Sequence, residues 1–528
     1  SGHIPMLFGA PADSALVIGY ASGVTAGAVS LYRPSTLDLV EIEPAVVEAS
    51  HFFEPQNLKP LSYEKSRLIL DDGRTYLTST ETKYDVVISE PSNPFLSGCS
   101  NLFTRDFFRS VRSHLNPGGR LFQWLQLYGM DPAGLSSLMA AITDEFPYVY
   151  AFHYESGNVD LLLYATDRPL RREDLPQWAH LPDPVRDDLR RVSIFSTADL
   201  WSLLRLLPSD ISEIARAATE INTDDSMFIE LHAPWVLHES PEANLALLAR
   251  FQQGVLGVAE APGAEHLSAE QLGELAFAYA LPRGEAAIGR RLAEEADRRG
   301  GSASAMVMRS ELAQRESQQQ PAVTLGTLDE AVNLDPAAFW PRFHRGRLHY
   351  FLARYAEALS DADELAARYP HDTRGLQLRL RTLGALGRFQ DAAKQAETLL
   401  ASPRGQFEKR IWADAAVALA AVGQLEQGIA QMERFLAAQP FSPNEWNVLA
   451  EMYRQSGRAQ DAERARANAG ISERNQLLLA HRSARWEARF GSRDRAAALL
   501  KSILERDPAY VAAREDLESL VRRTATGS

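Results

Sequence analysis

Short, continuous apolar runs alternate with helical patterns in the first part of the chain. Five runs rich in β-branched residues predict strands, at residues 15–19, 37–41, 67–70, 84–89 and 119–124. Such strands, separated by helices, are typical of a mostly parallel sheet with helices on both faces. Two further runs, 147–154 and 159–164, are joined by residues 155–158, a pattern that predicts a hairpin with one antiparallel strand closing the sheet edge. The pattern therefore predicts a doubly wound α/β domain.

A repeat of about 34 residues replaces the strand pattern from about Leu245 onward. Glycines 387, 423, 457 and 491 are spaced 36, 34 and 34 residues apart. A second column of small residues consists of Ala358, Ala392, Gly428, Ala462 and Ala496, and a third column consists of Pro336, Pro370, Pro403, Pro440 and Pro508. Small residues let paired helices approach, glycine permits the turn between them, and proline ends the second helix. The sequence therefore predicts stacked helix pairs.

These columns resemble the tetratricopeptide repeat. The clearest copy contains Trp446, Leu449, Ala450 and Tyr453, and is followed by Gly457 and Ala462. We expect five copies between about residues 339 and 508 and a capping helix from Ala509. The fold class is thus a Rossmann-like, class I methyltransferase-type domain followed by an all-α tetratricopeptide superhelix. The expected boundaries are 1–165 for the nucleoside-binding domain, 166–244 for a mainly helical appendage, 245–335 for degenerate helical repeats and 336–528 for the repeats with their cap.

Composition and charge narrow the function classes. The 528 residues are 45% hydrophobic and 23% charged, which is typical of a folded globular protein. A net charge of −14 repels phosphate backbones, so we expect no nucleic-acid partner. The single cysteine, Cys99, cannot form an intramolecular disulfide, and the 12 histidines are scattered, so we expect a reducing, cytoplasmic location and no metal. The uncharged stretch 14–32 is too rich in glycine and serine to predict a membrane span.

Candidate nucleoside-binding residues follow the predicted strands. Gly19 and Gly23 form a turn after the first strand, where missing side chains let the backbone approach a ligand. Glu41 follows the second strand, and a carboxylate there can accept hydrogen bonds from ribose hydroxyls. Asp72 and Gly73 follow the third strand, where an aspartate can accept from an adenine amino group. Because open α/β sheets bind ligands at the carboxyl ends of their strands, these residues predict a nucleoside site.

The fourth predicted strand leads into Glu90, a carboxylate that also falls at the carboxyl end of a strand. It is followed by Pro91-Ser-Asn93-Pro94 and then by the run Leu102-Phe-Thr-Arg-Asp-Phe-Phe108. A carboxylate at this strand end can orient or deprotonate an attacking amine. Glu90 therefore completes a set of candidate residues at four strand ends.

The ordered motifs resemble spermidine synthase and its relatives over about residues 2 to 165. The matching motifs are Val17-Ile-Gly19, Val40-Glu-Ile-Glu43-Pro44, Asp72-Gly-Arg74, Tyr84-Asp-Val-Val-Ile-Ser-Glu-Pro91 and Pro117-Gly-Gly119. A later segment, Ile221-Asn-Thr-Asp-Asp225 with Ile229 and Glu230, resembles longer, repeat-fused members of the group. The resemblance implies a transferase that binds decarboxylated S-adenosylmethionine and moves its aminopropyl group to a polyamine amine. It places the ribose carboxylate on Glu41, the adenine-side aspartate on Asp72 and the catalytic aspartate on Glu90.

The sequence departs from the family pattern at the polyamine site. Ser22 replaces an aspartate that pairs with the ammonium group of the aminopropyl chain, and Asn93 replaces a second acidic residue. We count Ser22 and Asn93 as candidate substrate-binding residues. We also expect no counterpart of the family's amino-terminal β-hairpin domain, because only about a dozen residues precede the first strand. Since removing the partner of a desolvated ammonium costs about 2–5 kcal/mol, we expect low activity towards polyamines.

These observations leave three functions open. The leading hypothesis is transfer of an aminopropyl or other alkyl group from an S-adenosyl nucleoside to a small amine. The first alternative is methyl transfer from S-adenosylmethionine, because Ser22 no longer selects a decarboxylated chain. The second is a catalytically silent, ligand-binding scaffold that acts through its repeats. In each case we expect a protein or peptide partner on the repeat surface, and longer relatives carry membrane segments that could tether the protein to the cytoplasmic face of a membrane.

Overall fold

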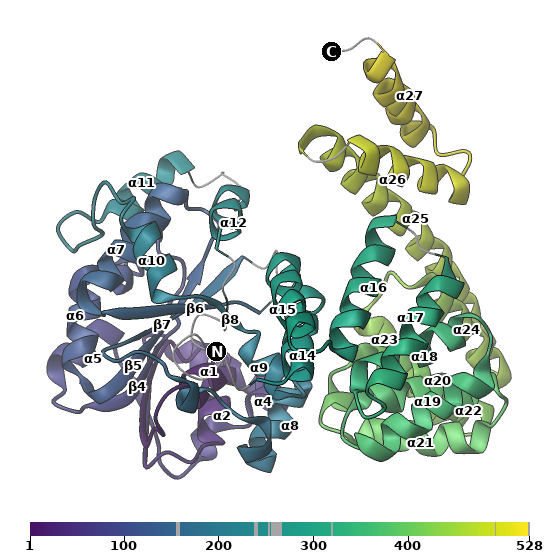
Figure 1. The fold of residues 1–528 in the computed structure, drawn as a ribbon, viewed down its shortest axis with the longest axis horizontal. Coiled ribbons are helices and arrows are strands. Elements are labelled where there is room, and N and C mark those ends of the chain that lie inside the picture. Colours follow the sequence, from purple (N-terminus) through teal and green to yellow (C-terminus); the bar gives the residue numbers. More distant parts are fainter. Residues whose placement is uncertain are drawn as a thin grey trace. The chain divides into compact units, whose positions relative to one another are not determined.

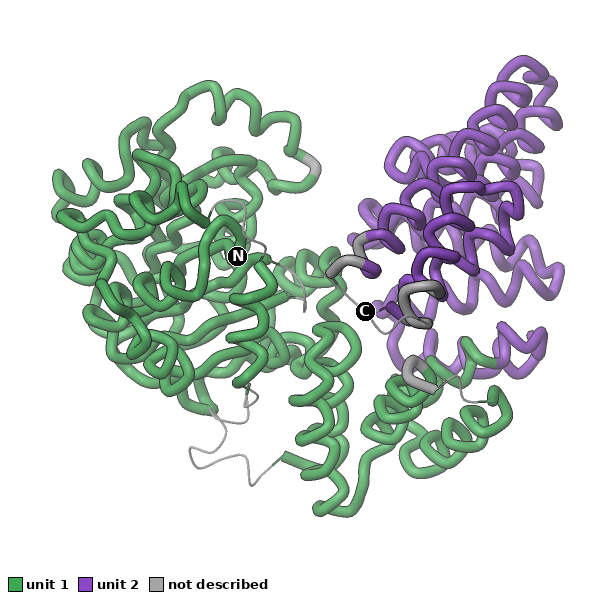
Figure 2. The backbone as a smooth tube through the Cα atoms, turned by 90° about the horizontal axis from the view of Figure 1, so that it is seen from above, with its two compact units in different colours: residues 1–348 green, residues 349–528 purple. Residues whose placement is uncertain are grey.

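The computed structural model describes residues 1–154, 159–236, 241–251, 254, 267–317, 320–490 and 493–525. The chain separates into two compact units, Ser1–Leu348 and His349–Ser528, which Figure 2 shows in green and purple. The division falls within one helix, α18 (Phe339–Phe351). Within the described part of the chain, no helix has both the length and the apolar character needed to cross a membrane.

Unit 1 is built around an eight-stranded sheet (Figure 1). Its strands are β1 (Ser14–Ile18), β2 (Thr36–Glu41), β3 (Ser66–Leu70), β4 (Tyr84–Ser89), β5 (Leu115–Gln126), β6 (Tyr148–Phe152), β7 (Asp160–Thr166) and β8 (Leu204–Leu206). The spatial order is β3-β2-β1-β4-β5-β7-β6-β8. The first five strands pair in parallel, whereas β7 runs antiparallel to both β5 and β6. This confirms the predicted Rossmann-like, methyltransferase-type fold.

The far end of the sheet differs from the expectation. The antiparallel strand β7 does not close the edge, because β6 and β8 lie beyond it. Strand β8 falls in the segment that was expected to be mainly helical. It was not expected because its short Leu-Arg-Leu sequence lies in an apolar run that also fits a helix. The expected turn at residues 155–158 lies outside the described residues.

Helices cover both faces of the sheet. The helices up to α12 are α1 (His3–Leu7), α2 (Val24–Ser30), α3 (Pro44–Ala49), α4 (Glu54–Asn57), α5 (Gly73–Ser79), α6 (Arg105–Ser113), α7 (Pro132–Glu145), α8 (Asp183–Arg191), α9 (Thr197–Trp201), α10 (Pro208–Ala215), α11 (Phe228–Val236) and α12 (Glu242–Leu248). Alternate residues of the strands point to opposite faces of the sheet and pack in two separate cores. Val17, Ile88 and Phe122 pack in one core, and Leu16, Val87 and Leu121 pack in the other. We call these core A and core B. Both faces are buried, as continuous apolar strands require.

The helical part begins in unit 1 and continues through unit 2. Unit 1 contains α14 (Ala269–Ala280), α15 (Ala286–Arg298), α16 (Ala303–Ser317), α17 (Pro321–Leu334) and most of α18. Unit 2 contains α19 (Tyr355–Arg368), α20 (Thr373–Ala385), α21 (Phe389–Ala401), α22 (Lys409–Ala421), α23 (Leu425–Ala438), α24 (Pro443–Gln455), α25 (Ala459–Phe490), α26 (Arg493–Arg506) and α27 (Val511–Ala525). Within each unit, neighbouring helices pack against one another, from α14 to α17 in unit 1 and from α19 to α27 in unit 2, as in a repeat array.

The three repeat columns have the predicted structural roles. Gly387, Gly423 and Gly457 all adopt positive φ values between paired helices, while Gly491 lies outside the described residues. The small-residue column is buried between helices, with Ala358, Ala392 and Ala496 at 0% exposure. Each proline of the third column stands two residues after a helix ends, at Leu334, Arg368, Ala401, Ala438 and Arg506. These features confirm the tetratricopeptide-type architecture.

One repeat boundary is absent. The proline period would place the next proline at position 474, but the residue there is Arg474, and α25 runs through it for 32 residues. The second helix of the fourth expected copy and the first helix of the fifth are therefore one continuous helix. Without a proline, the backbone N–H at this position is free to continue the helical hydrogen bonds.

Candidate functional site

The strand order brings the expected site residues to one end of the sheet. Asp72, Gly19 and Glu90 follow β3, β1 and β4, and Glu41 is the last residue of β2. These four strands are consecutive neighbours in the sheet. Because adjacent strands lie about 4.8 Å apart, these four positions span about 15 Å. We call this the carboxyl end of the sheet. The strand order reverses between β1 and β4, because the chain adds β2 and β3 on one side of β1 and then β4 and β5 on the other. Open α/β sheets form ligand crevices at such a reversal.

The glycine turn lies against the backbone of Glu90. Gly19 has a φ of +90°, and a Cβ atom on it would come within 2.6 Å of the Glu90 carbonyl oxygen. The Glu90 N–H donates to the carbonyl of Ile18 at 2.9 Å, so the loop after β4 begins alongside this turn. Gly23, with a φ of +78°, is the N-cap of α2. Side chains at Gly19 and Gly23 would strain a backbone that must stay close to its neighbours.

Glu41 is 8% exposed, and its carboxylate binds the turn. One oxygen accepts from the backbone N–H groups of Tyr20 and Ala21, at 3.1 and 3.2 Å, and the other accepts from Glu43 N–H at 3.0 Å. A carboxylate has about four acceptor positions, so acceptor capacity remains for a ligand hydroxyl. Ser22, in the same turn, is held by its carbonyl, which accepts from the Asn57 amide at 2.9 Å.

Asp72 has a structural role besides any ligand contact. Its Oδ1 accepts from the backbone N–H groups of Arg74 and Thr75, at 3.1 and 2.8 Å, and so caps α5. Gly73 packs against the end of β1, because a Cβ atom there would lie 2.4 Å from Ile18 Cγ2. The cap occupies one carboxylate oxygen, and Oδ2 stays available for a ligand.

Glu90 and Asn93 begin the loop between β4 and α6. The Glu90 carboxylate forms no hydrogen bond or ion pair with any described residue. The Asn93 side-chain oxygen accepts from the Tyr128 hydroxyl at 3.3 Å. Phe95 packs on Gly129, whose added Cβ atom would lie 2.5 Å from the Phe95 ring. The loop after β4 therefore rests on the loop after β5, and Glu90 keeps an uncommitted carboxylate at the carboxyl end of the sheet.

Three buried polar side chains near this end were missed by sequence reasoning. Ser89 of β4 and Gln123 of β5 occupy paired positions in the two strands, and both are 0% exposed. The Ser89 hydroxyl and the Gln123 side-chain oxygen have no hydrogen-bond partner among the described residues. Gln126, also 0% exposed, has neither amide atom paired. Buried polar groups are usually satisfied, so these unpaired atoms single out the ends of β4 and β5. The feature of the sequence that could have identified these residues is the presence of glutamine in an otherwise apolar strand.

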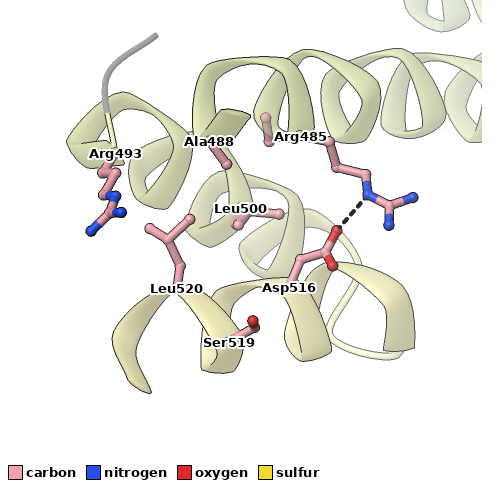
Figure 3. A pocket seen from close by; sticks show the side chains of 8 residues that line it. Arg485, Ala488, Arg493, Leu500, Asp516, Ser519 and Leu520 are labelled. Carbon is pink, nitrogen blue, oxygen red and sulfur yellow. Dashed lines mark ion pairs between the residues drawn. The ribbon is translucent and has the colours of Figure 1, made fainter. Parts of the chain in front are cut away.

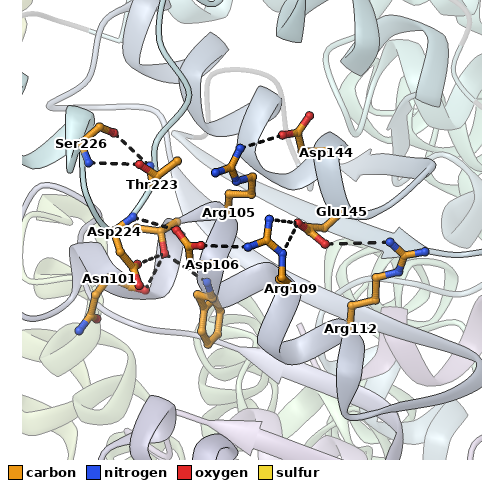
Figure 4. Close-up of polar contacts among 12 residues, drawn as sticks. Asn101, Arg105, Asp106, Arg109, Arg112, Asp144, Glu145, Thr223, Asp224 and Ser226 are labelled. Carbon is orange, nitrogen blue, oxygen red and sulfur yellow. Dashed lines mark hydrogen bonds and ion pairs between the residues drawn. The ribbon is translucent and has the colours of Figure 1, made fainter.

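The Asn222–Glu230 segment fastens the loop after β4 (Figure 4). Asp224 accepts hydrogen bonds from Arg74 and from the Thr104 hydroxyl, the latter at 2.7 Å, and its own N–H donates to Asp106 at 3.0 Å. Asn222 donates to the Phe103 carbonyl at 2.9 Å, and Glu230 accepts from the Ser100 hydroxyl. We call residues 222–230 the strap. It ties together the end of this loop and the starts of α5 and α6.

Two other hollows lie away from these residues. One, of about 840 Å³, is lined by Gly9, Pro11 and Ala12, which precede β1 and therefore lie at the amino end of the strands. The other, of about 360 Å³, lies among α25, α26 and α27 of unit 2, where Arg485 pairs with Asp516 at 3.0 Å (Figure 3). Neither contains an expected site residue. Among the described residues, no group of three or more His, Cys, Asp and Glu side chains is arranged to hold a metal ion.

Comparison with known proteins assigns the first part of the chain. Residues 2–149 match the family model "Spermine/spermidine synthase domain". A polyamine aminopropyltransferase from Methanocaldococcus jannaschii is 33% identical over 132 residues, which is 24% of this chain and 45% of that protein. The chain thus spans less than half the length of this curated relative.

Two solved structures are similar to separate parts of the chain. Spermidine synthase from Thermotoga maritima matches 36% of this chain and 71% of its own, with 19% identity and a TM-score of 0.28. MamA (residues 41 to the end) from Desulfovibrio magneticus RS-1 matches 33% of this chain and 96% of its own, with 19% identity and a TM-score of 0.30. On the sequence motifs, the strand order and the family match, the amino-terminal part of this chain is a spermidine synthase-type domain, followed by tetratricopeptide-type helices.

Proposed function

We propose that the carboxyl end of the sheet binds an S-adenosyl nucleoside and transfers an alkyl group, in the leading case aminopropyl, from its sulfonium to an amine. The observation that carries the proposal is the Glu90 carboxylate, which forms no hydrogen bond or ion pair with the described residues and begins the loop beside the Gly19 turn. A carboxylate in this position can orient an amine and accept its proton.

The residues around Glu90 fit a nucleoside. Glu41 and Asp72 each keep acceptor capacity beyond their backbone contacts. Gly19 and Gly23 leave room for close approach of a ligand to the turn. Glu41 would accept from ribose hydroxyls, Asp72 from the adenine amino group, and Ser22 and Asn93 would line the substrate side. Decarboxylated S-adenosylmethionine, or S-adenosylmethionine itself, would supply the electrophilic carbon next to sulfur.

The chemistry needs little beyond alignment. The lone pair of the amine forms a C–N bond while the C–S bond breaks, and its electron pair leaves on sulfur as a neutral thioether. The new ammonium then loses a proton, which Glu90 can accept. Holding the two reactants in line supplies much of the rate acceleration in such reactions.

Product identity tests the proposal against its alternatives. The purified full chain is incubated with an amine and either decarboxylated S-adenosylmethionine or S-adenosylmethionine. Methylthioadenosine from the first supports aminopropyl transfer, and S-adenosylhomocysteine from the second supports methyl transfer, which Ser22 in place of a carboxylate favours. Glu90→Gln, which keeps the shape but not the charge, should abolish either product. If neither product forms, the scaffold function replaces both. The expected protein or peptide partner of the repeats stays a prediction.

A further inference from the structure

A mostly apolar cavity of about 470 Å³ lies on the core A face of the sheet. Its apolar wall includes Ile4 and Leu7 of α1, Leu162 of β7, Leu189 of α8, and Ile194 and Leu203 near α9. His153 and Tyr154, just beyond β6, complete one side. The volume lies within the range of pockets that hold small organic molecules.

The strand register places this cavity beside Glu90. Ile88, two residues before Glu90, and Phe122 both pack in core A, so alternate residues of β4 and β5 share that face. Trp124, two residues after Phe122, pairs directly with the wall residue Leu162. Strand β4, which leads into Glu90, is therefore two strand spacings, about 10 Å, from strand β7, which carries the wall residue Leu162.

The polar groups of the wall are already paired with one another. Asp188 accepts from His3 Nε2 at 2.8 Å and from Arg191, and Arg191 also donates to the Gln56 carbonyl at 3.0 Å. The Tyr154 hydroxyl donates to the Val192 carbonyl at 2.8 Å. None of the described lining residues is an aspartate or a glutamate. A second ammonium group inside the cavity would therefore meet no carboxylate in the described lining, and the adjacent Asp188 already pairs with His3 and Arg191.

Two polar residues stand at the paired ends of β5 and β7, next to the wall residue Leu162 in the strand register. Gln126 and Asp160 pair directly across β5 and β7, on the same face as Trp124 and Leu162. Gln126 is fully buried with both amide atoms unpaired. Burial raises the pKa of Asp160, and the charge of His153 opposes that shift. The strand ends thus offer polar groups for one amine, followed by an apolar space.

We infer that this cavity is the acceptor pocket and that it selects a primary amine carried on an uncharged, apolar body rather than a polyamine. The inference rests on the proposed transfer reaction and names its acceptor class. The single amino group lies at the Gln126 end, where its lone pair attacks the carbon next to sulfur, and its proton passes to Glu90. The apolar body fills the space above Leu162.

Hexylamine and hexane-1,6-diamine make a matched pair of probes, because they differ only in whether the far end is a methyl group or an ammonium-bearing carbon. Calorimetric titration of the full chain, with methylthioadenosine present, should give at least about tenfold tighter binding of hexylamine, because burying an unpaired ammonium is costly. Equal or tighter binding of the diamine overturns the inference.

Val192, a lining residue that is 48% exposed, provides the variant. Val192→Asp adds a carboxylate at the cavity wall and should raise the diamine-to-monoamine affinity ratio about threefold, whereas the uncharged Val192→Asn should leave it unchanged. Equal ratios in both variants contradict the inference. Release of methylthioadenosine from decarboxylated S-adenosylmethionine, or of S-adenosylhomocysteine from S-adenosylmethionine, is measured separately and reports on transfer itself. Preferred hexylamine binding with neither product refutes the proposed function and leaves the pocket's selectivity standing.

Discussion

Removing the Asp224 side chain should loosen the loop that carries Glu90. Asp224 accepts hydrogen bonds from two Arg74 nitrogens and from Thr104, and it joins the strap to α5 and α6. Because its side chain is 38% exposed, solvent screening reduces each contribution to the lower part of its usual range. Asp224→Ala, which loses all three contacts, should lower the free energy of unfolding by about 1–2 kcal/mol. Asp224→Asn keeps one acceptor oxygen and should cost about half as much.

The pH dependence gives an independent check on the same ion pair. Burial raises the pKa of Asp224, but hydrogen bonds from Arg74 and Thr104 more than offset it, so the pKa lies below its ordinary value. A carboxylate whose pKa is lower in the folded state stabilises the protein above its unfolded pKa, about 4, and loses that effect as the pH falls through the folded pKa. The difference between wild type and Asp224→Asn should therefore be full at pH 7 and shrink towards pH 3.

Melting temperature and hydrogen exchange measure the two consequences of this substitution. Asp224→Ala should lower the melting temperature by about 2–5 °C and speed amide exchange in residues 91–103. The matched control is Asp225→Ala, because Asp225 has no hydrogen bond or ion pair with any described residue. Equal melting temperatures and equal exchange in the two variants would refute the role of the strap.

Three further predictions address other parts of the chain. Asp72→Ser should keep the α5 cap but weaken nucleoside binding by about 1.5 kcal/mol in calorimetry, with an unchanged melting temperature; unchanged affinity would remove Asp72 from the site. Burial raises the pKa of Glu274 to about 7. Stability should therefore fall as pH rises from about 4.5 to 7, and Glu274→Gln should remove this decline in thermal melts; a decline that persists would contradict it. Arg474→Pro should interrupt α25 and cost about 3 kcal/mol relative to Arg474→Ala, measured by urea unfolding; a smaller cost would indicate that the helix tolerates a break.

The sheet and the repeats could be predicted because their signals are local and recur. The observed boundaries of each of the first four strands lie within a residue or two of the boundaries of the predicted apolar run. Every glycine of the turn column that the structure describes has positive φ. Strand β8 could not be predicted, because three residues in a leucine-rich run have no period of their own and pair only through β6. The continuous α25 follows from a missing proline, a signal that appears only when the columns are aligned.

The candidate site could be predicted in part for a related reason. Residues at strand ends, such as Glu41 and Glu90, could be predicted because the strands that lead to them could be predicted. The backbone contacts of Glu41 and Asp72 were not visible, since capping and turn hydrogen bonds depend on the final backbone geometry. Gln126 lies just beyond the predicted run 119–124, and its unpaired amide appears only once the neighbouring strands are placed. The cavity beside it is lined by segments far apart in sequence.

The unbroken α25 makes two expected repeats behave as one mechanical element. Repeat arrays normally fray from their ends one unit at a time, with each turn acting as a stopping point. At a rise of 1.5 Å per residue, α25 is a rod of about 48 Å that offers no such point between Ala459 and Phe490. Any force or partner that orders the helices packed on its carboxyl half also orders its amino half, where Ala462 and Ala465 contact α24. A change at the last helices of the chain is therefore transmitted along α25 to the helices that pack on its amino half.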